Sequence, residues 1–200
     1  TFDVFRDTTP LVEGLSIVLA PEGVLSVEFP PVLNLLERVQ FDTIYHEHFS
    51  YFSLRTACDI FERCGLLVFD VEALPTHGGS IRIYAQHDAS LRRSSMKRVT
   101  ELLKRELSEP ELFWVGRFPW RVKAIKNNLV EHLIDCSLRG VSVAGFGAPA
   151  KANTLLNYCG VRPDLLSYVV DDNPHKVGRF MPGSRIPISL SSRLFEEQPD

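Results

Sequence analysis

Helical and strand patterns alternate along this chain, and this alternation constrains its fold more than any other feature. Residues 9–20 place apolar side chains at helical spacing, and a Pro-Glu-Gly turn then leads into an apolar run at residues 24–29. Such a run, rich in branched side chains, is typical of a buried strand. The pattern returns as a short helix at residues 55–64 and a strand at residues 66–71. We therefore predict an α/β protein.

The next segment breaks the alternation. Residues 80–86 alternate apolar and polar side chains, which indicates a strand with one wetter face. Because this strand directly follows the strand at residues 66–71, we expect it to be an antiparallel insertion into an otherwise parallel sheet.

The second half of the chain begins with two charged helical stretches, at residues 94–108 and 119–138. Residues 141–151 then give a strand, a glycine turn and the start of a helix, and residues 166–170 give another strand. This order predicts a small parallel α/β unit that begins near residue 120.

Composition excludes several classes of protein. The 200 residues carry a net charge of -3, and the Lys and Arg residues are scattered, so we expect no nucleic-acid partner. No apolar run approaches the roughly 20 residues of a membrane span, so we expect no membrane partner. The four cysteines show no Cys-x-x-Cys pairing, which predicts reduced, buried thiols in a cytoplasmic protein. Because the chain starts without an initiator Met or a signal peptide, we expect a fragment of a longer protein.

The densest group of proton-handling side chains is the run Tyr45, His46, Glu47 and His48, which lies among aromatic residues. Polar groups sunk among apolar neighbours acquire the shifted pKa values that proton transfer needs. His48 or Glu47 could remove a proton from a carbon next to a carbonyl, and Tyr45 could stabilise the enolate oxygen. Two alternatives stay open: a set of hydrogen-bonded core side chains at a domain seam, and a metal site at His46 and His48 that lacks a third ligand at a sensible spacing.

Two glycine motifs are candidates for ligand contact. His77, Gly78 and Gly79 join two strands, and the loop is either a substrate contact or an ordinary connection with an incidental His. The turn Gly145-Phe146-Gly147-Ala148-Pro149-Ala150-Lys151, followed by Asn153, places amides and a lysine at a helix start, as in a phosphate cradle.

The glycine turn also raises a competing prediction, a nicotinamide-dependent oxidoreductase. Asp171 and Asp172 lie about 20 residues beyond the turn, where a ribose-binding acid would be expected. The dinucleotide fingerprint, however, requires a third glycine where this chain has Ala150, and Pro149 removes an amide donor. Beyond the second strand, Lys176 and Arg179 lie in a turn-rich loop that either meets an anion or is a solvated surface loop.

Together these segments resemble the sugar C-methyltransferases, which use S-adenosylmethionine to methylate C-3 of a nucleotide-linked 4-keto-6-deoxy sugar. The motifs that carry the resemblance run in the family's order: Val27-Glu28-Phe29-Pro30, Gln40 to Ser50, Leu74 to Arg82, Gly145 to Lys151, Asn157-Tyr158-Cys159-Gly160 and Asp172 to Arg179.

The resemblance implies an architecture. Residues 1–90 would be the second half of a Rossmann-like methyltransferase domain, residues 91–119 a helical connector, and residues 120–200 a smaller Rossmann-like parallel α/β domain that contacts the substrate nucleotide. The S-adenosylmethionine site and a zinc-binding module would lie before Thr1, so we expect the isolated chain to be inactive. Half of such a sheet exposes an edge, through which we expect a homodimer.

The resemblance also implies roles. Tyr45, Glu47 and His48 would be the catalytic residues, with His48, aided by Glu47, as the base and Tyr45 orienting the sugar or its keto oxygen. No residue is expected to bind metal in this chain. The residues expected to bind the nucleotide-linked sugar are His46, His77, Gly78, Gly79, Gly147, Ala148, Lys151, Asn153, Lys176 and Arg179. A nicotinamide oxidoreductase and a non-catalytic module that binds nucleotide sugars are the alternatives.

Overall fold

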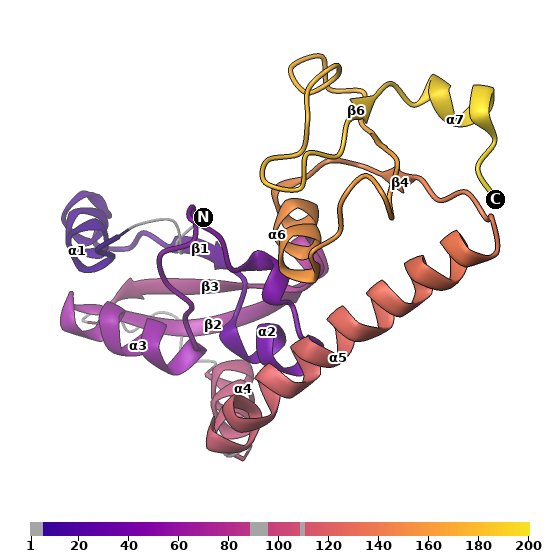
Figure 1. Ribbon diagram of the computed structural model, residues 1–200. Coiled ribbons are helices and arrows are strands. Elements are labelled where there is room, and N and C mark those ends of the chain that lie inside the picture. The colour runs from indigo at the N-terminus through magenta and orange to yellow at the C-terminus, as the bar shows by residue number, and fades with distance from the viewer. Residues whose placement is uncertain (1–5, 89–95, 109–110) are drawn as a thin grey trace. The chain divides into compact units, whose positions relative to one another are not determined.

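The computed structural model describes residues 6–88, 96–108 and 111–200 and shows the mixed α/β fold that the sequence predicts (Figure 1). The chain forms two compact units. The first consists of Thr1–Gln40 and His46–Phe118, and the second of Phe41–Tyr45 and Pro119–Asp200. The short segment 41–45 thus belongs to a different unit from the residues on either side of it.

The first unit is built on a three-stranded sheet. Its strands are β1 (Leu25–Phe29), β2 (Leu66–Leu74) and β3 (Ser80–His87), in the order β1-β3-β2. Strand β3 pairs antiparallel with both neighbours, so β1 and β2 run in the same direction. The antiparallel insertion is therefore confirmed, whereas the Rossmann-like character of this unit stays a prediction.

Strand β1 differs from its prediction as a fully buried strand. Only Phe29 is buried, and Ser26 is exposed. The difference arises because β1 lies at the edge of the sheet among the described residues, and its Glu28 belongs to a polar face. On that face Arg82 donates to Glu28 at 3.0 Å and Tyr84 donates to Glu72 at 2.9 Å.

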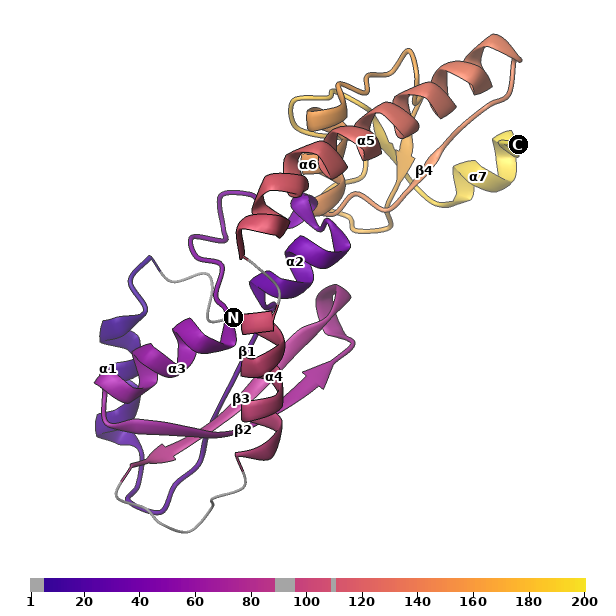
Figure 2. The same cartoon turned by 90° about the horizontal axis from the view of Figure 1, so that it is seen from below.

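The other face of the sheet carries the core of the first unit. Helices α3 (Leu54–Arg63) and α4 (Lys97–Ser108) lie on the same face of this sheet (Figures 1 and 2). Helix α3 buries Leu54, Ala57 and Phe61, which recur at helical spacing. These side chains join a cluster with apolar residues of all three strands and with Val12 of helix α1 (Thr9–Val18).

Helix α3 has well-defined ends. The Thr56 amide donates to the Ser53 side chain at 3.0 Å, which is an N-cap. The carboxylate of Glu106 also accepts from the Leu54 amide at 2.7 Å, so α4 helps to cap α3. Gly65 follows the helix with a φ of 73°, the left-handed conformation that the sequence predicts at this position. Helix α2 (Val32–Arg38) follows β1.

The second long helix begins earlier than the sequence predicts. Helix α5 covers Glu111–Leu138, so Pro119 lies inside it instead of at its start. Proline removes one helical hydrogen bond and usually marks a helix boundary. For this reason the sequence prediction placed the start of the helix at Pro119, too late in the chain. Of the predicted connector, residues 91–95 and 109–110 lie outside the described residues.

The second unit contains a parallel sheet, as predicted. Its strands are β4 (Gly145–Phe146), β5 (Val169–Val170) and β6 (Ile188–Ser189), in the order β4-β5-β6. Helix α6 (Ala150–Cys159) connects β4 to β5, and helix α7 (Ser192–Glu197) follows β6.

The predicted strand before the glycine turn is displaced, because the paired residues are Gly145 and Phe146 instead of residues 141–144. A Cβ atom on Gly145 would lie 2.7 Å from Cγ1 of Val169, so the absent side chain permits the close approach to β5. The core of this unit joins α5, α6 and the strands through buried residues such as Leu133, Leu156 and Ile188.

All four cysteines are free, as predicted. Cys136 and Cys159 are buried, whereas Cys58 and Cys64 are half-buried. Burial raises the pKa of the Cys58 thiol to about 11, so this thiol is protonated at neutral pH. Within the described residues, no helix is both long and apolar enough to cross a membrane.

Candidate functional site

The residues predicted to be catalytic lie in a turn instead of an extended segment. A 3-10 helix covers Phe41–Thr43, and the backbone then bends at Tyr45 and turns through His46 and Glu47. The Tyr45 amide donates to the Thr43 carbonyl at 3.1 Å. Alternate side chains therefore do not point to opposite faces here, as they would in a strand.

The side chains of this turn are more accessible than the sequence predicts. His46 and Glu47 are exposed, and Tyr45 and His48 are half-buried. The argument that these groups are sunk among apolar neighbours is therefore wrong for His46 and Glu47. The buried residues of this segment, Phe41 and Thr43, lie in the 3-10 helix before the turn.

The start of the turn is anchored on α6. The ring centroid of Phe41 lies 5.1 Å from that of Tyr158, and the two rings are tilted by 59°. The ammonium of Lys126 lies 5.6 Å from the Tyr158 centroid, within the range of a cation–π contact. Phe41, which precedes the turn by four positions, is thus fixed by Tyr158, whose ring also contacts Lys126.

The loop between β2 and β3 has an unusual backbone. His77, Gly78 and Gly79 have φ values of 54°, 86° and 117°. Gly78 is held by two donors, because Arg38 Nη1 and Gln40 Nε2 reach its carbonyl oxygen at 2.7 and 2.8 Å. The loop is therefore fixed by side chains from outside it, and the exposed His77 lies at its tip.

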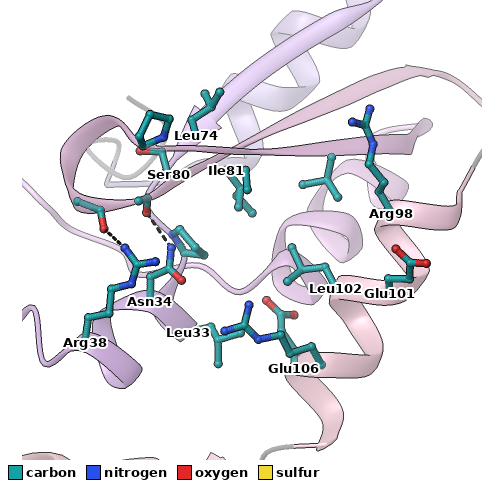
Figure 3. A pocket seen from close by; sticks show the side chains of 17 residues that line it. Leu33, Asn34, Arg38, Leu74, Ser80, Ile81, Arg98, Glu101, Leu102 and Glu106 are labelled. Carbon is teal, nitrogen blue, oxygen red and sulfur yellow. Dashed lines mark hydrogen bonds between the residues drawn. The ribbon is translucent and has the colours of Figure 1, made fainter.

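A cavity of about 640 Å³ lies beside this loop within the first unit (Figure 3). Its volume is in the range of small-molecule sites. Helix α2, the end of β2, the start of β3 and helix α4 enclose it. The residues with apolar side chains that line it include Leu33, Val71, Leu74, Ile81 and Leu102. Gly78 and Gly79, which the sequence indicated as candidate ligand contacts, also line it.

In the second unit, two backbone amides of the glycine turn are hydrogen-bonded to acceptors of the protein itself. The Gly147 amide donates to the Val170 carbonyl at 2.7 Å, and the Ala148 amide donates to Oδ2 of Asp171 at 2.9 Å. These two amides are therefore not free for a phosphate, contrary to the cradle expected from the sequence. Lys151 and Asn153 follow on the first turns of α6, where both side chains are half-buried.

Asp171 is the centre of a bonded cluster at the end of β5. Lys176 Nζ donates to its Oδ2 at 2.8 Å, and the Asn173 amide donates to its Oδ1 at 2.9 Å. The bond from Lys176 and the amides of Asn173 and Ala148 lower the pKa of Asp171 to about 2. The carboxylate thus joins the glycine turn to the loop that follows β5.

This cluster changes the roles expected from sequence in that loop. The ammonium of Lys176 is paired with Asp171, whereas Arg179 is exposed. Of the two basic residues, Arg179 is the more exposed, although 37% of the Lys176 side chain is also accessible.

The two aspartates expected to bind ribose in an oxidoreductase are both bound to protein groups. Asp171 accepts the three donors described above, and Asp172 accepts from the amide and the hydroxyl of Ser191 at 3.0 and 2.9 Å. A ribose acceptor needs a free carboxylate oxygen, so the geometry disfavours the oxidoreductase alternative.

The residues that organise these loops were missed at the level of sequence. Asn34, Arg38 and Gln40 contact a loop about 40 positions away, and no local pattern reports such a contact. In the described part of the chain, no group of three or more His, Cys, Asp or Glu residues is arranged to hold a metal ion.

The fold and the order of these motifs define a class of protein. Residues 75–200 match the family of C-methyltransferase C-terminal domains, and the chain belongs to this family. Among known proteins, the chain is similar to the C-methyltransferase NovU of Streptomyces niveus, with 38% identity over 196 residues. The alignment covers 97% of this chain and 46% of NovU, so the chain spans about half the length of its curated relative.

The two comparisons cover different parts of the candidate site. The turn at residues 45–48 and the whole of α2 precede the family match, which begins at residue 75. The alignment with NovU extends over nearly the whole chain and therefore includes them. The glycine turn and the Asp171 cluster lie within both.

Proposed function

We propose that this chain is the C-terminal part of an S-adenosylmethionine-dependent methyltransferase that methylates C-3 of a nucleotide-linked 4-keto-6-deoxy sugar. The observation that carries the proposal is the turn at residues 45–48. It gathers a phenol, a carboxylate and two imidazoles at an accessible position and is anchored by the buried Phe41. The membership in the C-methyltransferase family supports the reaction class.

The turn supplies the groups for the first chemical step. C-3 lies next to the keto carbon, so its proton is acidic. A nitrogen of His48, aided by Glu47, takes this proton, and the electron pair of the C–H bond moves into an enolate. The Tyr45 hydroxyl donates to the enolate oxygen, which carries the developing charge.

S-adenosylmethionine, when bound, supplies an electrophilic methyl group. The glycine turn at residues 145–151 does not fit this cofactor, because its two central amides are already bonded to Val170 and Asp171. We therefore assign no residue of this chain to it, and we place its site, together with the zinc module, outside the chain.

The remaining residues bind substrate in this proposal. His46, His77, Gly78 and Gly79 contact the sugar from the first unit. From the second unit, Lys151, Asn153, Lys176 and Arg179 contact the nucleotide through their side chains, and Gly147 and Ala148 contact it through atoms other than their bonded amides. Arg179 offers the exposed charge for a phosphate. The edge of β1 is the proposed surface for a homodimer, since β1 pairs with β3 alone among the described residues.

Exchange of the C-3 proton with solvent deuterium tests the proposal without methyl transfer. The whole protein is incubated with the 4-keto sugar nucleotide and S-adenosylhomocysteine in D2O, and the substrate mass is followed. We expect the wild type to add one deuterium at C-3, and His48→Asn to slow this exchange by about 10²-fold or more, as for loss of a general base. The Asn variant keeps a polar side chain, and His132→Asn, a change on α5, is the matched control.

Absence of exchange in the wild type would contradict the proposed reaction.

Calorimetric titration of the 200-residue chain separates the alternatives. Binding of thymidine diphosphate without the oxidised nicotinamide dinucleotide supports a methyltransferase that keeps its sugar-nucleotide half. Binding of the dinucleotide alone would favour an oxidoreductase. Nucleotide binding that is unchanged in Tyr45→Phe and His48→Asn, with no deuterium exchange by the wild type, would favour a non-catalytic module.

A further inference from the structure

The loop at His77–Gly79 has an unusual backbone conformation, and one of its residues is not a glycine. All three residues have left-handed φ values, and His77 is not a glycine. A non-glycine residue in this region costs free energy, of the order of 1 kcal/mol or more. Such a conformation persists only where surrounding groups fix it, and it is found most often at functional sites. The groups that fix this loop are therefore of interest for its function.

Helix α2 and the two residues after it provide this hold. Asn34 Nδ2 donates to the Gly79 carbonyl at 2.9 Å, and Arg38 Nη1 donates to the Gly78 carbonyl at 2.7 Å (Figure 3). Gln40 Nε2 donates to the same Gly78 carbonyl at 2.8 Å. Three side chains from one short segment thus bind two consecutive carbonyl groups of the loop.

The fit between the segment and the loop is close. A Cβ atom on Gly79 would lie 2.9 Å from both Arg38 Nη1 and Asn34 Nδ2. A Cβ atom on Gly78 would lie 2.7 Å from Gln40 Nε2. The two glycines are therefore needed for the approach of these donors as well as for their φ values.

Gln40 also has a special place in the chain. Its amide donates to the Leu35 carbonyl at 2.9 Å, directly after Val39 ends α2 in a left-handed conformation. The next residue, Phe41, begins the 3-10 helix that leads to the turn with Tyr45 and His48. The side chain that holds the His77 loop therefore belongs to the residue from which the proposed catalytic segment starts.

We propose that Asn34, Arg38 and Gln40 are positioning residues, which hold the His77–Gly79 loop so that His77 is presented to the substrate. This inference rests on the proposed function and deepens it. It assigns no chemistry to the three residues, because they act through the loop and not on the reacting atoms. It predicts that their loss lowers turnover more than substrate affinity.

The first measurement tests the hold. Backbone 15N relaxation of Gly78 and Gly79 is compared in the wild-type chain, Gln40→Glu and Arg38→Ala. Glu has nearly the same shape as Gln but presents an oxygen in place of the Nε2 donor, so the bond to Gly78 is lost. We expect fast motion of both glycines to increase in each variant, while the amides of β3 keep the wild-type values.

Arg63→Ala is the matched control. Arg63 and Arg38 each lie in the last turn of a helix, so both substitutions remove the same favourable interaction with the helix dipole. Arg63 is exposed and lies on α3, outside the segment that holds the loop. Glycine motion unchanged in Gln40→Glu and Arg38→Ala would overturn the inference.

The second measurement tests the role in the site through C-3 deuterium exchange by the whole protein. We expect Gln40→Glu and Arg38→Ala to lower the maximal exchange rate about tenfold, which corresponds to about 1.4 kcal/mol and lies within the range for one hydrogen bond. The substrate concentration for half-maximal rate should stay within about twofold. Arg38→Lys keeps a donor and should recover much of the loss.

The outcomes separate this inference from the proposed function. A loop that becomes mobile while the exchange rate stays at the wild-type value would overturn the positioning role. Loss of substrate affinity in place of rate would overturn it as well. No exchange by the wild type would instead refute the proposed function, and the inference would fall with it.

Discussion

Replacement of Asp171 by Asn should destabilise the second unit in a manner that depends on pH. The pKa of Asp171 is lowered from its ordinary value of 3.8 to about 2, first by Lys176 and then by the amides of Asn173 and Ala148. Each pH unit corresponds to about 1.4 kcal/mol, so the ionised carboxylate stabilises this unit by about 2 kcal/mol at neutral pH. The Asp171 side chain is 15% exposed but that of Lys176 is 37% exposed, so solvent screens part of this interaction and about 2 kcal/mol is an upper value.

The sign of the pH dependence follows from the lowered pKa. The stabilisation is fully present above about pH 4, where the carboxyl of the unfolded chain is also ionised, and it is lost as the pH falls from about 4 to about 2. Asn resembles the protonated carboxyl in charge. The variant should therefore be less stable than the wild type at pH 7 and approach it near pH 2.

The measurement is urea unfolding followed by the NMR signals of the Val169 and Ile188 amides, which lie in β5 and β6 and report on this unit. Asp164→Asn changes the same charge at an exposed position of the unit and serves as the control. A difference between Asp171→Asn and the wild type of equal size at pH 7 and pH 2 would refute the electrostatic reasoning. So would a difference below about 0.5 kcal/mol at pH 7.

Three further predictions concern the stability of the first unit, each measured by urea unfolding. Gly79→Ala should lower the free energy of unfolding by about 1–3 kcal/mol, because φ is 117° and two side chains of α2 crowd the new Cβ. Gly14→Ala, in open space on α1, should instead raise it by about 0.5–1 kcal/mol. Equal effects of the two substitutions would contradict this reasoning. Ser53→Ala should lower the free energy of unfolding by about 1 kcal/mol, because the α3 N-cap is lost. An unchanged stability would show that Glu106 alone is sufficient to cap the helix. Phe61→Ala should cost about 3–5 kcal/mol because Phe61 is fully buried, and a cost below about 1 kcal/mol would mean that the core refills the space.

Part of the fold could be predicted because it depends on local patterns. Alternating side chains at residues 80–86 identified β3 and its antiparallel direction, and helical spacing with Gly65 identified α3 and its end. The predicted element bounds were wrong where a residue did not follow its usual local preference. Pro119 continues a helix, and Gly145 takes the place of a larger residue in a strand because β5 approaches closely there.

The candidate site shows the same division. The sequence by itself determined which groups are available: the Tyr45 to His48 run, the His-Gly-Gly loop and the glycine turn. The tertiary structure decided how they are used, since it exposes Glu47, binds Gly147 and Ala148 to protein acceptors and fixes His77 through Asn34, Arg38 and Gln40. The physical reason is range. Propensity and periodicity act over a few residues, whereas the bonds that set these roles join side chains and backbone groups more than 20 positions apart in the chain.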